Sequence, residues 1–272
     1  MIVDVAAAPV YAYTGARALV AAQPTVAFVH GAANDHSVWA LQSRWFAYHG
    51  WNVLAVDLPG HGRSGGAALA SVEAIADWLP ALLDAAGIER AALVGHSLGA
   101  LAALACAARH PARVTRIALI GPSVPMPVTD LLLAAARADD HAAFELINGW
   151  SVSAGKQLGG NAVPGVWLTG NAMRLMERTR PGVLFTDLCA CNGYADGLAH
   201  AAAVRAPALV VTGQRDLMAP PRNAVALRAA LADVRAVELP DTGHALMAEQ
   251  PDAVLDTLRT FLVPSPGGGG TT

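Results

Sequence analysis

The amino-acid sequence predicts an α/β fold in which helices cover both faces of a mostly parallel sheet. Short apolar runs typical of buried strands alternate along the chain with longer stretches of helical character. The chain has 272 residues, of which 54% are apolar and 14% are charged, so it can bury a sizeable core. Chains of this size in α/β proteins commonly form one domain, and we expect that organisation here.

The expected strands are short apolar runs bounded by turn residues. They lie at residues 10–13, 18–20, 25–29, 53–57, 91–94, 116–120, 208–212 and 236–239. The expected helices lie at about 37–49, 71–86, 98–109, 221–231 and 251–262. Ser71 can cap the second of these helices, because its hydroxyl can accept from the free N–H groups of the first turn, and Gly87 can end it.

One long insertion interrupts the alternation. Roughly 75 residues of helical character separate the sixth expected strand from the seventh, and a compact fold does not leave such a length as a structureless loop. We expect a mostly helical insertion over residues 124–200 and a core formed by residues 1–123 and 201–263. Residues 264–272 are a Pro/Gly-rich tail with nothing to bury, so the sequence predicts disorder there.

A serine lies between an expected strand and an expected helix. Its surroundings read Gly95-His96-Ser97-Leu98-Gly99. At such a turn the backbone folds so tightly that side chains two positions either side of the serine would collide with neighbouring segments, and glycine removes the collision. The pattern therefore predicts a nucleophile elbow, with the serine hydroxyl exposed at the end of the sheet.

Two further polar residues stand where a reactive serine needs them. A serine hydroxyl requires a base to take its proton, and the base requires an acid that orients it and stabilises its charged form. Asp216 follows the strand-like run at 208–212, and His244 follows the run at 236–239. Because the carboxyl ends of parallel strands share one edge of the sheet, both side chains are candidates to reach Ser97.

With these residues in the order Ser, Asp, His, the chain resembles the α/β-hydrolase superfamily. It is similar to the capped, single-domain members, which include esterases, carbon–carbon bond hydrolases and cofactor-free perhydrolases, over residues 10–262. The resemblance implies an α/β-hydrolase fold with a catalytic triad of Ser97, Asp216 and His244. It also implies that residues 124–200 form a helical cap over the active site, inserted after the sixth strand. No metal or organic cofactor is implied.

A further segment resembles the same family. The run at 25–29 leads into His30-Gly31-Ala32. In the family, the residue after this His-Gly pair and the residue after the nucleophile each donate a backbone N–H to the oxyanion. The resemblance therefore implies that Ala32 and Leu98 form the oxyanion hole, while His30 is expected to be structural.

Other histidines and acids fit the triad less well. Asp57 ends a strand upstream of the elbow, against the family order, and Asp241 is too close in sequence to His244 to bond it from across the site. His96 lies inside the elbow and is expected to pack there. The remaining histidines considered lack a strand-end context: His36, His49, His61, His110, His141 and His200.

Charge, hydropathy and cysteine content exclude several functions. The net charge is −3 and the arginines are scattered, which argues against a nucleic-acid-binding surface. No apolar run reaches the about 18 residues of a membrane span, and the amino terminus lacks the pattern of a signal peptide, so we expect a cytoplasmic protein without membrane contact. Cys106, Cys189 and Cys191 have no metal-ligand spacing, so no metal site is predicted. The sequence leaves the oligomeric state open.

The predicted reaction is hydrolysis of a carboxylic ester or lactone in a small molecule, through an acyl-enzyme on Ser97. A serine at the elbow disfavours the alkyl-enzyme chemistry of related dehalogenases and epoxide hydrolases, which need an aspartate there. In the expected cap, Trp150, Trp167 and Met126 are candidate substrate contacts, because an apolar lid excludes water and shapes the pocket.

Two alternative functions remain open. The first is a C–C bond or enol-lactone hydrolase of an anionic ring-cleavage product, whose carboxylate an arginine of the cap would hold. The candidates are Arg137, Arg174, Arg178 and Arg180. The second is a ligand receptor with a vestigial triad, which an assay of turnover on short aryl esters would distinguish from an enzyme.

Overall fold

The computed structural model describes residues 1–263, which form one eight-stranded sheet of order β1-β2-β4-β3-β5-β6-β7-β8. The strands are β1 (Ile2–Val5), β2 (Ala8–Tyr13), β3 (Thr25–Val29), β4 (Asn52–Val56), β5 (Ala91–His96), β6 (Val114–Ile120), β7 (Ala208–Gly213) and β8 (Val234–Leu239). Strand β2 is antiparallel to β1 and to β4, and all other pairs are parallel. The predicted architecture, a mostly parallel sheet, is confirmed.

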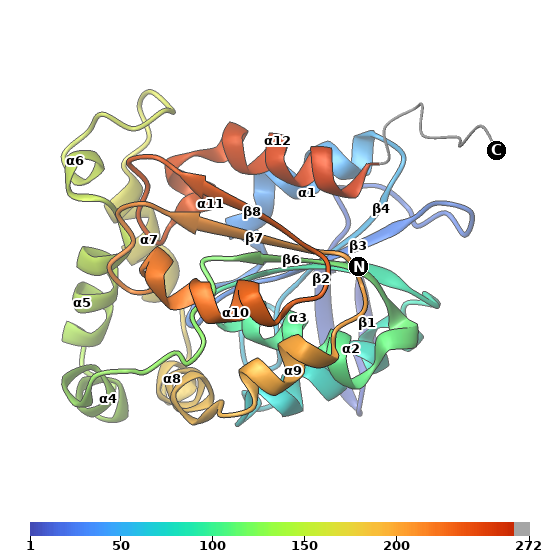
Figure 1. The fold of residues 1–272 in the computed structure, drawn as a ribbon. Helices are drawn as coiled ribbons and strands as arrows, with labels where there is room; N and C mark the ends of the chain where they lie inside the picture. Colours follow the sequence, from blue (N-terminus) through green and yellow to red (C-terminus); the bar gives the residue numbers. More distant parts are fainter. Residues whose placement is uncertain (264–272) are drawn as a thin grey trace.

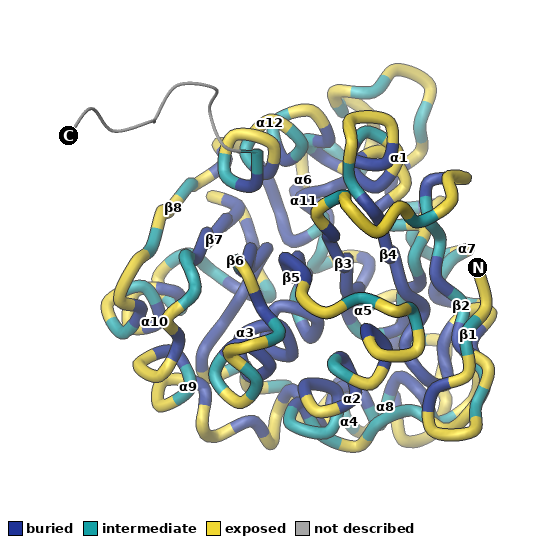
Figure 2. Tube along the Cα trace, turned by 90° about the vertical axis from the view of Figure 1, so that its right-hand side faces the viewer, coloured by how far each residue is buried: buried dark blue, intermediate teal, exposed yellow. Residues whose placement is uncertain are grey.

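The central strands are buried on both faces, which is why they read in the sequence as unbroken apolar runs. Every residue of β3, β4 and β5 is buried. In Figure 2 the central strands form a dark-blue interior, and the exposed residues lie mainly on the edge strands β1 and β8 and on the outer helices and loops. Strand β5 lies between β3 and β6, so the residue that follows it, Ser97, emerges at the end of a central, fully buried strand.

Helices pack on both faces of the sheet (Figure 1). One face carries α2 (Val72–Ala85), α3 (Leu98–Arg109), α9 (Gly197–Ala203) and α10 (Val225–Ala230). The other carries the 3₁₀-helix η1 (His36–Trp39), α1 (Ala40–Tyr48), α11 (Leu246–Glu249) and α12 (Pro251–Leu262). Two short 3₁₀-helices, η2 (Pro111–Arg113) and η3 (Pro221–Ala224), precede β6 and α10. Ser71 caps α2 as predicted, because its hydroxyl accepts from the N–H of Ala74 at 3.1 Å.

The amino-terminal strands differ from the expectation. Residues 18–20, which the sequence predicted as a strand, lie in a loop. There the Asn52 side chain accepts from the N–H of Val20 at 2.7 Å and donates to its carbonyl at 2.9 Å, so one amide replaces a strand partner. The sheet edge is formed instead by the β1–β2 hairpin. Its turn residues Ala6 and Ala7 have φ of 50° and 64°, as the commonest two-residue hairpin turn requires.

The chain between β6 and β7 is mostly helical, as predicted, and lies beyond the carboxyl ends of the strands (Figure 1). Its helices are α4 (Asp130–Arg137), α5 (Ala142–Ser151), α6 (Ala154–Gln157), α7 (Leu168–Met176) and α8 (Val183–Gly193), followed by α9. An apolar cluster of its own, including Ile147, Met176 and Leu184, holds this insert together and reaches Ala33 of the core. We call residues 124–200 the cap.

Two expectations concern the limits of the chain and its relation to a membrane. The tail at 264–272, for which the sequence predicted disorder, lies outside the described residues. Within residues 1–263 no helix is both long enough and apolar enough to cross a membrane.

Candidate active site

Ser97 occupies a sharp turn between β5 and α3. Its φ of 53° and ψ of −117° lie in a strained region for a residue with a side chain. A Cβ on Gly95 would overlap the backbone of Gly99, and a Cβ on Gly99 would overlap the carbonyls of Val29 and His30. The two glycines are therefore needed because the turn packs directly against itself and against the end of β3.

The structure brings Asp216 and His244 together although they are 28 positions apart. The Nδ1 of His244 lies 2.7 Å from Oδ2 of Asp216, and both side chains are buried. The other carboxylate oxygen, Oδ1, accepts from the N–H groups of Met218 at 2.9 Å and Ala219 at 2.7 Å. Because Nδ1 faces the carboxylate, Nε2 of His244 is the nitrogen left for a nucleophile.

Opposing effects act on the Asp216 carboxyl. Burial alone would raise its pKa, since burial disfavours the charged form. The charge and hydrogen bond of His244, with the N–H groups of Ala219 and Met218, outweigh burial and hold the pKa of Asp216 below its usual range. Asp216 is therefore an anion that can orient His244 and stabilise its protonated form.

The loop that carries His244 is anchored from two sides. The carbonyl of His244 accepts from Nε2 of His96 at 2.9 Å, and the N–H of Gly243 donates to Oε1 of the buried Glu249 at 3.0 Å. Burial and the nearby His244 lower the pKa of His96 to about 3, so the His96 imidazole is neutral. His96 packs inside the elbow, as the sequence suggested, and also fixes the backbone of the base.

Both predicted oxyanion donors flank the serine. Leu98 is the first residue of α3, so its N–H has no partner within the helix. Ala32 lines the pocket that also holds Ser97. A Cβ on the intervening Gly31 would lie 3.2 Å from Cβ of Ser97, which shows how closely the loop at 30–34 approaches the elbow.

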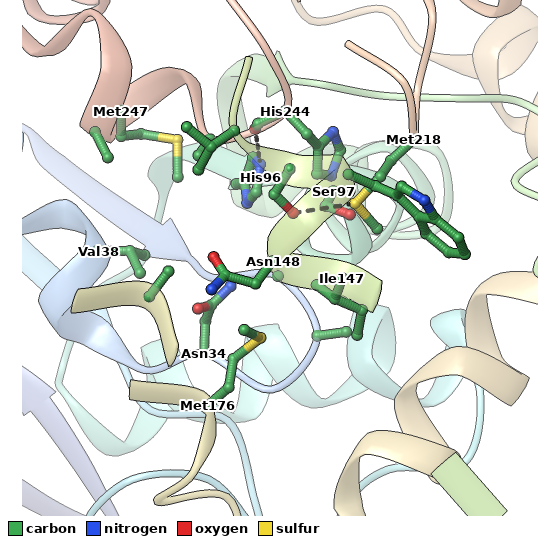
Figure 3. A pocket seen from close by; sticks show the side chains of 18 of the residues that line it. Asn34, Val38, His96, Ser97, Ile147, Asn148, Met176, Met218, His244 and Met247 are labelled. Carbon is green, nitrogen blue, oxygen red and sulfur yellow. Dashed lines mark hydrogen bonds between the residues drawn. The ribbon is translucent and has the colours of Figure 1, made fainter. Parts of the chain in front are cut away.

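A pocket of about 670 Å³ opens over Ser97 and His244, between the cap and the core (Figure 3). That volume is within the usual range for small-molecule sites. In the described part of the chain no hydrogen bond links the Ser97 hydroxyl to His244, although both line the pocket. In enzymes without bound substrate, catalytic hydrogen bonds are often long or poorly aligned, so this geometry is compatible with the predicted roles.

The structure places two of the three predicted substrate contacts in the pocket lining and one outside it. Met126 and Trp150 line the pocket. Trp167 is not part of the pocket lining, and its side chain is 70% exposed. It precedes the first turn of α7, and its ring lies over Gly170, where the missing side chain leaves room for it outside the pocket.

Sequence reasoning missed most of the pocket wall. Three methionines and three asparagines line it beside the candidate residues: Met176, Met218, Met247, Asn34, Asn148 and Asn171. Figure 3 labels all of these except Asn171. The methionines come from the cap, from the loop after Asp216 and from α11, so nothing in their sequence positions brings them together. Methionine is flexible and fills irregular space, which suits a pocket that adapts to the shape of its ligand.

None of the described pocket-lining residues is an aspartate, glutamate, lysine or arginine. The arginines considered for holding a carboxylate are occupied elsewhere or lie outside the lining. Arg137 lies over the ring of Phe185, with its Cζ 4.7 Å from the ring centroid, and Arg174 is paired with Glu177 at 2.6 Å. Arg180 donates to the carbonyl of Ser64 at 2.8 Å, and Arg178 is not part of the lining.

One cluster in the described residues has the spacing of metal ligands: Asp35, His36 and Asp57. Its atoms already have protein partners. Oδ1 of Asp57 contacts Nδ1 of His36 at 2.7 Å, and Oδ1 of Asp35 accepts from the N–H of Ser37 at 2.8 Å. These hydrogen bonds explain why the three side chains lie together: they stabilise the loop before η1.

Comparison with known proteins gives matches over nearly the whole chain. A family model described as "Alpha/beta hydrolase family" matches residues 26–257. The pimeloyl-[acyl-carrier protein] methyl ester esterase of Neisseria meningitidis serogroup C is 31% identical over 258 residues, covering 87% of this chain and 93% of that protein. The enol-lactonase from Burkholderia xenovorans LB400 has a similar crystal structure, with a TM-score of 0.84, 26% identity and coverage of 97% of this chain and 100% of that one.

Other relatives match over shorter stretches. The 2-hydroxy-6-oxononadienedioate/2-hydroxy-6-oxononatrienedioate hydrolase of Paraburkholderia phymatum is 38% identical over 125 residues, or 42% of this chain. The match covers 43% of that protein, and a further relative is matched over 26% of its length. The chain therefore spans less than half the length of these two relatives.

Proposed function

The chain belongs to the alpha/beta hydrolase family, and on that premise we propose that it is a serine hydrolase that cleaves carboxylic esters or lactones through an acyl-enzyme on Ser97. One observation carries the proposal. A strained serine at an elbow and a buried Asp216–His244 pair border the same pocket, and that pocket has no charged lining in the described chain. Similarity to a methyl ester esterase and to an enol-lactonase supports both substrate classes.

The geometry supports the following sequence of steps. His244 takes the proton of Ser97 through Nε2 while Asp216 holds Nδ1, and the serine oxygen attacks the carbonyl carbon of the ester. The N–H groups of Ala32 and Leu98 donate to the oxyanion of the tetrahedral intermediate. His244 then protonates the leaving alcohol. A water molecule, deprotonated by the same imidazole, attacks the acyl-enzyme and releases the acid.

The uncharged lining favours a neutral substrate over an anionic one. A carboxylate that moves from water into an apolar pocket loses its hydration. Without a cationic partner, no interaction in the pocket compensates for that loss. The arginines of the cap are not part of the pocket lining, so the pocket offers none for this role. This is the reason to prefer an esterase or lactonase over a hydrolase of dianionic ring-cleavage products.

We expect p-nitrophenyl butyrate to be hydrolysed with a kcat/KM about a hundredfold higher than mono-p-nitrophenyl succinate. The two esters share the leaving group and the acyl length, so only the terminal carboxylate differs, and its unpaired burial costs several kcal/mol. Ring-fission dienoates of similar size should have a lower kcat/KM than the butyrate ester for the same reason. A preference for the dienoates of more than about a hundredfold would contradict the esterase proposal and direct mutagenesis to the cap arginines.

We expect a series of p-nitrophenyl acyl esters to show an optimum at short to medium chain length. Each buried methylene contributes about 0.8 kcal/mol until the pocket is full, after which overpacking reverses the trend. Replacing Met176 by tryptophan should move the optimum to shorter chains, because Met176 is one of the cap residues that line the pocket. If the optimum acyl length were unchanged in the Met176→Trp protein, the acyl group of the substrate would not lie against residue 176.

A ligand receptor with a vestigial triad is the competing function of another class. Serine, histidine and aspartate are all present and correctly ordered here, so nothing in the site explains a loss of turnover. Steady multiple turnover of p-nitrophenyl butyrate supports the enzyme. A single stoichiometric burst without further product would support the receptor.

A further inference from the structure

A second histidine–carboxylate pair is buried beside the site, and the steps above do not use it. Nε2 of His61, in the loop after β4, lies 2.9 Å from Oδ2 of Asp187, on cap helix α8. Both side chains are only 2% exposed. This contact joins the cap to the core across 126 positions of sequence.

The partners of His61 define its protonation state. Its Nδ1 lies 3.0 Å from the carbonyl of Pro59, and its Nε2 faces the Asp187 carboxylate. A carbonyl and a carboxylate only accept hydrogen bonds, and a neutral imidazole carries a single N–H. An imidazolium satisfies both contacts, so the geometry fits an ion pair between His61 and Asp187.

The surrounding charges agree with this assignment. Burial alone would lower the pKa of His61, but the charge and hydrogen bond of Asp187, the Pro59 carbonyl and the charge of Asp57 raise it overall. The ring of His30 lies 4.8 Å from that of His61. Burial and the neighbouring His61 lower the pKa of His30 to about 4, so His30 stays neutral and adds no competing charge.

The same carboxylate holds the loop at 30–34, which we call the oxyanion loop. Oδ2 of Asp187 accepts from the N–H of Ala33 at 3.0 Å, and Oγ1 of Thr179 donates to the carbonyl of Ala33 at 3.2 Å. Ala33 has a φ of 54°, a left-handed conformation that an alanine keeps only when its surroundings enforce it. The proposed oxyanion donor, Ala32, is the residue immediately before it.

We propose that Asp187 is a positioning residue that extends from the cap to fix the oxyanion loop, with His61 holding its carboxylate in place. The cap then does more than cover the pocket, because it supplies the bond that sets the backbone next to Ala32. The inference rests on the proposed function, since it assigns Asp187 a role in the geometry of that oxyanion hole.

We expect Asp187→Asn to lower kcat for p-nitrophenyl butyrate about 10- to 100-fold while KM changes less than about twofold. Deleting an oxyanion donor outright costs about 10²- to 10³-fold in kcat, which sets the upper limit for a change that only loosens the donor. The loss falls on kcat because the oxyanion exists in the transition state and not in the bound ester. His61→Gln should act in the same direction. The double variant should lose no more than the worse single variant, because the two residues form one unit.

The pH profile gives a readout that a purely structural role would not change. A histidine whose pKa is raised in the folded protein contributes its stabilisation fully below its ordinary value of 6.5 and loses it as the pH rises through the raised value. The wild-type kcat should therefore fall on the alkaline side as His61 loses its proton. In Asp187→Asn this alkaline limb should disappear, because His61 no longer has a carboxylate to hold against the N–H of Ala33.

Asp77→Asn is the matched control, because Asp77 also pairs with a histidine, His110 at 2.7 Å, but on the exposed surface of α2. Its kcat and KM should stay within about twofold of wild type, as expected for an exposed pair. If Asp187→Asn does not fold, Thr179→Val tests the same loop by removing the second cap bond to Ala33, with a smaller loss in kcat.

Hydrogen exchange tests the positioning directly and needs no substrate. The amides of residues 31–34 should exchange at least about tenfold faster in Asp187→Asn than in wild type or Asp77→Asn. Unchanged exchange there, or unchanged kcat in a folded Asp187→Asn protein, overturns the inference while leaving the proposed hydrolase intact. If the wild type hydrolyses no ester, the proposed function fails, and the exchange rates alone decide whether Asp187 holds the loop.

Discussion

Replacing Ser97 by alanine is expected to lower kcat for p-nitrophenyl butyrate by about a million-fold, which leaves only the residual rate that the oxyanion hole and substrate binding supply. Without the hydroxyl no acyl-enzyme can form, and the Asp216–His244 pair has no nucleophile to activate. The elbow itself should persist, because Gly95 and Gly99 provide the close packing and alanine removes only one oxygen. The melting temperature should therefore stay within a few degrees of wild type.

The measurement combines steady-state hydrolysis with covalent labelling by a fluorophosphonate. Wild type should be labelled once, on Ser97, and lose activity in proportion. Ser71→Ala is the matched control: it removes a serine hydroxyl from the start of α2, outside the pocket lining. It should cost about 1 kcal/mol of stability through the lost cap and leave kcat unchanged. Activity of Ser97→Ala within about tenfold of wild type would show that the elbow is not the nucleophile's position.

The strand pattern and the order of Ser97, Asp216 and His244 were predictable from the sequence because each signal is local. A buried parallel strand reads as a short apolar run, and the residue after it lies at the carboxyl edge of the sheet. Gly95 and Gly99 mark the turn that needs them. Three such local signals at one sheet edge place the residues near one another without knowledge of the cap.

The pocket wall and the Asp187–His61 pair could not be predicted in the same way. Asp187 is a single acid on a helix with no motif around it, and its partner lies 126 positions away. Which face of a cap helix meets the pocket depends on how the helices pack together. Trp167 illustrates the limit: its size suggested a substrate contact, but the space above Gly170 holds its ring on the outer surface.

Residues 18–20 show a second limit of pattern reading. An apolar run near the amino terminus has the composition of a strand, yet the side chain of Asn52 takes the hydrogen bonds that a neighbouring strand would have made. Such a side chain-to-backbone substitution has no periodic signature. The core strands were not subject to it, because their burial on both faces leaves backbone partners only within the sheet.

Replacing Asp216 by asparagine is expected to lower kcat about ten-thousand-fold with little change in KM, because a triad without its acid holds the base in the wrong tautomer. In the wild type the carboxylate accepts a hydrogen bond from the N–H at Nδ1 of His244, which leaves Nε2 free to take the proton of Ser97. An asparagine amide can instead donate to Nδ1, and the imidazole proton then lies on Nε2. A protonated Nε2 faces the serine and cannot accept the hydroxyl proton. The Asp216 carboxylate also accepts from two backbone N–H groups, so the variant should lose some stability yet stay folded, since the amide oxygen can keep those bonds.

The neighbouring Asp241→Asn provides the control that makes this result specific. Asp241 lies three residues before His244 in the same loop, but its side chain is exposed and its only salt bridge in the described chain is to Arg215 at 3.4 Å. Its loss should change kcat by less than about twofold, as expected for a surface ion pair. If Asp241→Asn lost the activity and Asp216→Asn retained it, the acid of the triad would be misassigned, despite the 2.7 Å contact between Asp216 and His244. If both variants kept full activity, His244 would be acting without an acid. The buried carboxylate would then serve only to hold the loop at residues 216–219, through the bonds it accepts from Met218 and Ala219.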